Sequence, residues 1–127
     1  MKIKYLILSI LISITSACSS TSVQNMSVEN VTLPKNSVGY ARPALANDMI
    51  TSVDLFIQKK LNCTTWSLEE VTESKAVDQL VFTNDGQIYR GTVSEKWRLQ
   101  ECGETLTLRL GITPGPQGGS LIRISKL

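Results

Sequence analysis

The spacing of apolar residues changes once along this chain, near Cys63, and that change constrains the fold more than any other feature. Before it, over residues 43–62, apolar side chains recur every three or four positions, which is the spacing of one helix face. They are Leu45, Met49, Val53, Phe56, Ile57 and Leu61. After it, apolar and polar residues alternate, as in strands with one buried face. The two periods predict an α+β fold, one amphipathic helix on an antiparallel sheet.

The alternating part of the chain predicts a four-stranded antiparallel meander. The segment from Trp66 to Val77 suits a ragged edge strand, although residues 67–70 could also begin a short helix. A hairpin turn is expected at Asn84-Asp85-Gly86, because Asp-Gly supplies the positive φ angles that a tight turn needs. The segments around this turn and after it are Leu80–Thr83, a strand from Gln87 through Leu99, Leu106–Ile112 and Leu121–Leu127, with a second turn at residues 114–119.

The first 17 residues have the pattern of an export signal. Lys2 and Lys4 precede an apolar run from Tyr5 to Ile14, about ten residues long, whereas a bilayer span needs roughly twenty. Removing these residues leaves 127 − 17 = 110, and the 13 basic residues fall to 11, against 11 acidic ones. A neutral domain without clustered Lys and Arg argues against nucleic-acid binding.

The residues around Cys18 resemble the lipobox of a bacterial lipoprotein precursor. The sequence Ile14-Thr15-Ser16-Ala17-Cys18 ends in two small residues and a cysteine, with Thr15 where the motif prefers Leu. The resemblance covers the first twenty residues. It implies lipidation of Cys18 with fatty acids such as palmitate and an anchor in the cell envelope. Ser19, where inner-membrane lipoproteins often have Asp, favours the periplasmic face of the outer membrane. Ordinary signal cleavage after Ala17 is the alternative.

Three regions follow from these features. Residues 1–17 are the predicted signal peptide, residues 18–42 the lipidated cysteine and a flexible tether, and residues 43–127 a small α+β domain. The tether is predicted because residues 19–40 are rich in Ser, Thr, Asn and Val and show no sustained helical or strand period.

The cysteine count supports lipidation independently. Three cysteines in an oxidising compartment would leave one free thiol. Lipidation of Cys18 removes that thiol and leaves Cys63 and Cys102 to form a disulfide that ties the end of the helix to the sheet. A metal site at this pair would lack further ligands, because the chain has no histidine.

The lack of histidine also excludes Ser/His and Cys/His catalysis. Carboxylate catalysis needs two acids that converge in one cleft. Only Glu95 is out of place, on the apolar register between Val93 and Trp97. We interpret it as an edge or bulge position paired with a Lys or Arg, and a carboxylate-based hydrolase is the remote alternative. No cofactor and no metal are expected.

The polar side of the strands is the expected partner-binding face, because one helix covers only one face of a sheet. Its predicted basic residues are Arg90, Lys96, Arg98 and Arg109. The run from Glu95 to Gly103, with Gly118-Gly119, resembles the C-terminal module of small uncharacterised envelope lipoproteins and implies no activity. The expected function is that of a membrane-anchored, non-enzymatic adaptor that binds an envelope protein. An inhibitor or immunity-type protein is the alternative, with residues 113–119 as its only candidate loop.

Overall fold

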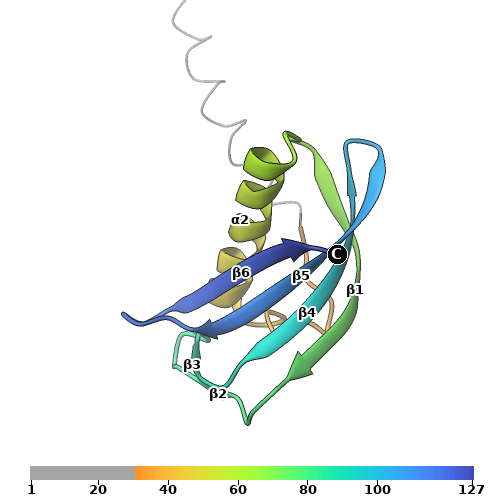
Figure 1. The fold of residues 1–127 in the computed structure, drawn as a ribbon. Coiled ribbons are helices and arrows are strands. Elements are labelled where there is room, and N and C mark those ends of the chain that lie inside the picture. Colours follow the sequence, from red (N-terminus) through yellow and green to blue (C-terminus); the bar gives the residue numbers. More distant parts are fainter. Residues whose placement is uncertain (1–30) are drawn as a thin grey trace, which may run out of the picture. The chain divides into compact units, whose positions relative to one another are not determined.

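One helix and six strands make up the part of the chain that the computed structural model describes, residues 31–127. They are α2 (Pro43–Lys60), β1 (Trp66–Ala76), β2 (Val81–Phe82), β3 (Ile88–Arg90), β4 (Val93–Glu101), β5 (Glu104–Pro114) and β6 (Ser120–Lys126). Four strands form an antiparallel sheet in the order β1-β4-β5-β6, and β2 and β3 pair separately (Figure 1). The predicted α+β fold is confirmed. The predicted signal peptide and Cys18 lie outside the described residues.

Helix α2 begins at the predicted residue and ends two residues before the predicted end. Pro43 occupies the first turn, where its missing N–H costs nothing, and Lys59 and Lys60 lie in the last turn beside the negative end of the helix dipole. The helix ends because Asn62 turns to a positive φ of 56°. Within residues 31–127, no helix combines the length and the apolarity that a bilayer crossing requires.

The core lies between α2 and one face of the sheet. Alternate residues of β4 and β5 point toward the helix, and Trp97, Leu108 and Leu110 are fully buried there. Each such side chain contributes roughly 1.5–3 kcal/mol when it leaves water. The predicted alternation of apolar and polar faces is therefore confirmed for both central strands.

The strand predicted from Gln87 through Leu99 is interrupted at residues 91–92. Gly91 has a φ of 91°, and a Cβ at this position would lie 2.9 Å from the carbonyl oxygen of Gln79. The chain therefore leaves the β2-β3 hairpin at Gly91 and enters the main sheet only at Val93. The hairpin itself forms as predicted, with Gly86 at a φ of 89°.

The segment from residue 66 onward forms an edge strand, as predicted, and the helix considered for residues 67–70 is wrong. Strand β1 pairs only with β4, and its register shifts twice, between Leu68 and Glu70 and between Val71 and Glu73. These two bulges explain the ragged sequence pattern, because each inserts a residue that interrupts the alternation of faces.

The prediction that the flexible tether runs to residue 42 is wrong for its last twelve residues, 31–42. Leu33, Ser37 and Val38 are buried, and the Asn36 side chain donates a hydrogen bond to the Val71 carbonyl of β1 (2.7 Å). Residues 31–42 lie on the same face of the sheet as α2 (Figure 1). Gly39 permits this packing, since a Cβ there would lie 2.6 Å from the Leu33 side chain. The polar composition of residues 31–42 does not indicate this packing, because the segment makes its contacts with strands that are distant in the sequence.

The predicted disulfide between Cys63 and Cys102 is present, with the two Cα atoms 6.1 Å apart. It joins the residues after α2 to the turn between β4 and β5. Closing a loop between residues 39 positions apart stabilises a domain by about 4 kcal/mol on the chain-entropy estimate. For a domain of this size that is a large part of a typical stability.

Candidate functional site

The candidate site is the face of the four-stranded sheet that points away from α2, here called the outer face. It carries acidic side chains on β1 and basic side chains on all four strands. Its charged residues are Glu69, Glu70, Glu73 and Lys75 of β1, Lys96 and Arg98 of β4, Arg109 of β5 and Arg123 of β6. Figure 1 shows α2 and residues 31–42 on the opposite side of the sheet, so neither of them covers this face.

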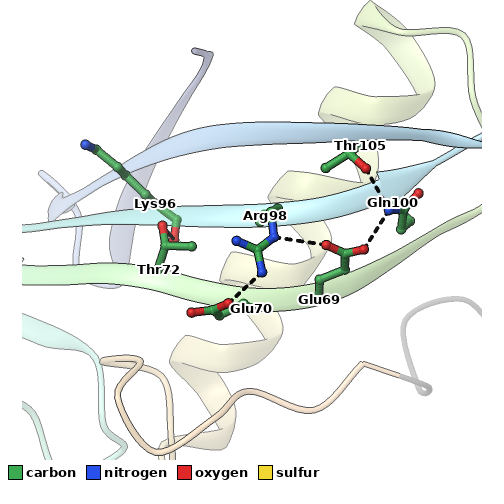
Figure 2. Close-up of polar contacts among 7 residues, drawn as sticks. All are labelled: Glu69, Glu70, Thr72, Lys96, Arg98, Gln100 and Thr105. Carbon is green, nitrogen blue, oxygen red and sulfur yellow. Dashed lines mark hydrogen bonds and ion pairs between the residues drawn. The ribbon is translucent and has the colours of Figure 1, made fainter.

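Arg98 is the centre of the largest polar cluster on the outer face (Figure 2). Its Nε donates to Glu69 (3.0 Å) and its Nη2 to Glu70 (2.6 Å). The bulge between Leu68 and Glu70 allows two consecutive glutamates to reach one guanidinium group. Gln100 Nε2 also donates to Glu69 (2.6 Å), and Gln100 bonds Thr105 of β5 (2.7 Å). The cluster therefore connects β1, β4 and β5.

A second cluster surrounds Glu73. Its carboxylate contacts the Nζ of Lys75 (3.1 Å) on the same strand and the Nζ of Lys96 (3.3 Å) on β4. Beside it, Thr72 donates to the Lys96 carbonyl (3.3 Å), as Figure 2 shows. Both basic residues that the sequence predicted on β4 are thus paired with glutamates of β1.

These contacts shift the protonation of the carboxylates and of Arg98. Hydrogen bonds from Gln100 and then Arg98 lower the pKa of Glu69, and those from Lys75 and Lys96 lower the pKa of Glu73. The hydrogen bond to Glu69 raises the pKa of Arg98. These contacts favour the charged forms of Glu69, Glu73 and Arg98.

Arg109 and Arg123 differ from the two basic residues of β4. Arg109 lies directly opposite Lys96 in the β4-β5 ladder, and Arg123 lies opposite Gly111 in the β5-β6 ladder. Both are exposed, and neither forms an ion pair with any residue of the described domain. The outer face is therefore acidic along β1 and basic along β5 and β6.

Arg90 does not lie on this face, contrary to the sequence prediction. It ends β3 and pairs with Val81 in the separate hairpin. The positive φ of Gly91 breaks the alternation that would have continued it into β4. Sequence analysis missed Arg123 and the glutamates of β1. The alternation of Arg123 with Ile122 and Ile124 could have placed it, whereas the bulges hid the glutamates.

Glu95 is neither at an edge nor at a bulge, and it has no cationic partner, so that interpretation is wrong. It lies on central strand β4 with 0% of its surface exposed. Four neutral groups donate to its carboxylate. They are Ser37 Oγ (3.0 Å), Val38 N (2.6 Å), Ser74 Oγ (2.7 Å) and Trp97 Nε1 (2.8 Å).

This arrangement gives Glu95 a clear structural role. Burying a carboxylate is costly unless hydrogen bonds replace its water, and both of its oxygens here accept two. The donors come from residues 37–38, from β1 and from β4, so the side chain ties residues 31–42 to the sheet. A substrate has no access to the carboxylate in this conformation, because the side chain is enclosed.

The sulfur atoms of Cys63 and Cys102 lie within 4.8 Å of a carboxylate oxygen of Glu101. Because the two sulfurs are bonded to each other, neither is a thiolate that could bind a metal.

The loop between β5 and β6, which contains the candidate inhibitor loop at residues 113–119, is a tight turn. The N–H of Gly115 donates a hydrogen bond to the Gly119 carbonyl (2.9 Å) and closes it.

No protein-family model, curated protein or solved structure matches this chain.

Proposed function

We propose that this protein is a membrane-anchored envelope lipoprotein that acts as a non-enzymatic adaptor and binds a protein partner through the outer face of its sheet. The observation that carries the proposal is the open outer face with its ordered charges. α2 and residues 31–42 both cover the opposite face, which leaves the ladders around Lys96 and Arg109 accessible. The lipobox-like sequence before Cys18 supports the anchor.

The outer face is acidic along β1 and basic along β5 and β6, so it is complementary to a protein surface that carries both acidic and basic residues. Arg98 and Lys96 are held in position by glutamates, so little side-chain entropy is lost when they contact a partner. Arg109 and Arg123 remain available for a partner's carboxylates. Charge patterns of this kind determine orientation and association rate more than affinity.

The anchor is tested by metabolic labelling with a radioactive fatty acid. The wild-type protein should carry the label and a Cys18→Ser variant should not. Label that persists in the variant would contradict lipidation at this residue.

The partner face is tested by chemical crosslinking in intact cells followed by purification of the chain. Arg109→Glu should reduce the crosslinked product, whereas Arg90→Glu should leave it unchanged. Arg90 is a matched control, because it is an exposed arginine that lies outside the outer face. Equal yields of crosslinked product from both variants would show that the partner does not bind at the outer face. An enzyme or a toxin as the sole crosslinked partner would favour the inhibitor alternative.

A further inference from the structure

Strands β1 and β6 are the two edges of the four-stranded sheet, and their backbone groups are protected differently. β1 carries two bulges, and Asn36 occupies its Val71 carbonyl. Bulges and covering side chains are devices that prevent an edge strand from pairing with another chain. β6 pairs with β5 along all 7 of its residues without a register shift. β6 is therefore the edge that is built to accept a strand.

The free backbone groups of β6 can be assigned from the ladder. The N–H of Leu127 donates to the Thr107 carbonyl of β5 (3.0 Å). In an antiparallel pair such bonds recur at every second residue. The backbone groups of Ser125 and Arg123 therefore face β5, and those of Ile122 and Ile124 point away from the sheet. No strand of the described domain pairs with this side of β6.

A groove runs along the same edge, between β6 and α2. Its volume is about 320 Å³, and four apolar side chains line most of it, with two lysines at one end. The lining residues are Ser52, Leu55, Phe56, Lys59, Lys60, Ile122 and Ile124. Leu55 is 46% exposed, so part of the apolar lining of the groove is in contact with solvent. A strand added to β6 would place every second side chain over this groove.

The charges around the groove are positive. Lys59 and Lys60 end α2 and line the groove, and Lys126 lies on the groove side of β6, opposite the buried Leu108. The exposed Arg123 lies on the other side of the same strand, opposite Gly111. The two helix carboxylates are engaged on other sides of α2. Asp48 accepts from Gln87 (2.9 Å), and Asp54 accepts from Trp66 (2.9 Å) and Gln58 (2.8 Å).

We propose that β6 binds an extended acidic segment of another protein as an added strand. The segment's apolar side chains would occupy the groove, and its backbone would bond to Ile122 and Ile124. Its acidic side chains would point to the other side of the added strand, beside Arg123, while Lys59, Lys60 and Lys126 would attract the segment by their positive charge at longer range. This binding surface shares Arg123 with the outer face, but its backbone and groove contacts lie elsewhere, and it does not depend on the anchor. A second copy of the chain, paired through its own β6, would place a basic edge strand beside another basic edge strand. Residues 19–30 of the chain itself contain a single acidic residue, Glu29.

The probe is a synthetic peptide, acetyl-Glu-Val-Glu-Val-Glu-Val-Glu-amide, titrated into the purified full-length chain in detergent. We expect saturable binding by calorimetry and slower amide hydrogen exchange at Ile122 and Ile124, with no change along β1. A peptide with Lys in place of Glu and an acidic peptide with Pro in place of the central Val should not bind. Comparable binding of either control peptide would contradict strand addition at a basic edge.

Two variants test the backbone and the charges separately. Ile124→Pro removes an N–H that points away from the ladder, a position where an edge strand tolerates proline, and it should abolish binding. A chain with Lys59→Glu and Lys60→Glu should bind about tenfold more weakly at low salt. The control carries Lys75→Glu and Arg90→Glu, which change the net charge equally but lie away from the groove. Equal weakening in the control would overturn the assignment, as would unchanged binding by a folded Ile124→Pro variant.

The peptide-free protein supplies the remaining outcomes. If β6 binds a segment of another protein, the amide hydrogens of Ile122 and Ile124 should exchange rapidly at every protein concentration when no peptide is present. Protection that increases with concentration would overturn the proposal in favour of a second copy. Protection that is present at all concentrations would overturn it in favour of a segment of the same chain. None of these results bears on the outer-face crosslinking experiment, so the two proposals fail independently.

Discussion

Glutamates are held in opposite ways on the two faces of the same sheet. On the inner face, Glu95 is enclosed and receives hydrogen bonds from four neutral donors and from no cation. On the outer face, Glu69 and Glu73 are partly exposed and are paired with Lys and Arg side chains. When an outer carboxylate loses a partner, water can hydrogen-bond to it instead. Glu95 is enclosed, so no water replaces a lost hydrogen-bond donor there.

The comparison teaches that the buried carboxylate determines the fold, while the exposed ones determine the charge of a surface. A buried charged group is destabilising unless all its neighbours are in place, so Glu95 makes the position of residues 37–38 a condition of folding. The outer ion pairs can be exchanged for contacts with a partner at little cost.

The largest effect is expected from Glu95→Ala. The change leaves four enclosed donors without an acceptor, and the free energy of unfolding should fall by about 3–5 kcal/mol. Urea unfolding followed by circular dichroism measures it. Glu73→Ala on the outer face is the control and should shift the unfolding midpoint only slightly. Similar losses of unfolding free energy in both variants would contradict the difference between the buried and the exposed glutamates.

A smaller effect is expected when one donor to Glu95 is removed. Ser74→Ala should lower the free energy of unfolding by about 1.5–3 kcal/mol, the usual range for a hydrogen bond to a charged group. Thr72→Ala is a matched control two residues earlier on β1, since its hydroxyl bonds a carbonyl on the exposed face. Its effect should stay within about 0.5 kcal/mol. A Thr72 effect as large as that of Ser74 would contradict the comparison.

Arg98→Met tests the outer face directly. We expect a modest drop in Tm at low salt, because Arg98 pairs with both Glu69 and Glu70. At 1 M salt the drop should vanish, since exposed ion pairs are screened. Thermal unfolding at the two salt concentrations measures the difference. A deficit that persists at high salt would show that the guanidinium group contributes mainly by packing.

The smallest effect concerns pH. The pKa values of Glu69 and Glu73 are lowered below their ordinary value of 4.5, so their stabilising contribution is complete above pH 4.5. It is lost as the pH falls through the lowered values, because the folded state then binds the protons that the unfolded state already holds. Gln100→Leu should raise the pKa of Glu69 and leave that of Glu73 unchanged, as measured by NMR titration. Equal shifts at both residues would point to a general field effect.

Local pattern was sufficient for much of this structure. The helical period from Leu45 to Ile57 and the alternation along β4 and β5 arise from the geometry of each element, so they can be recognised in a short window of sequence. The pairing of Cys63 with Cys102 was predicted by elimination. Three of the four arginine and lysine residues assigned to the polar face lie on it, because strand alternation carries that information.

Only the tertiary structure decided the rest. The donors to Glu95 come from positions up to 58 residues away, so no local pattern could distinguish a satisfied core carboxylate from an edge residue or a catalytic one. Residues 31–42 are packed in place by the hydrogen bonds to Glu95. This is why a polar segment was predicted to be a tether. Arg90 was misplaced because a backbone turn at Gly91, fitted against Gln79, interrupts the strand. Sequence determined which residues alternate, and long-range hydrogen bonds and close backbone approaches decided which of them meet.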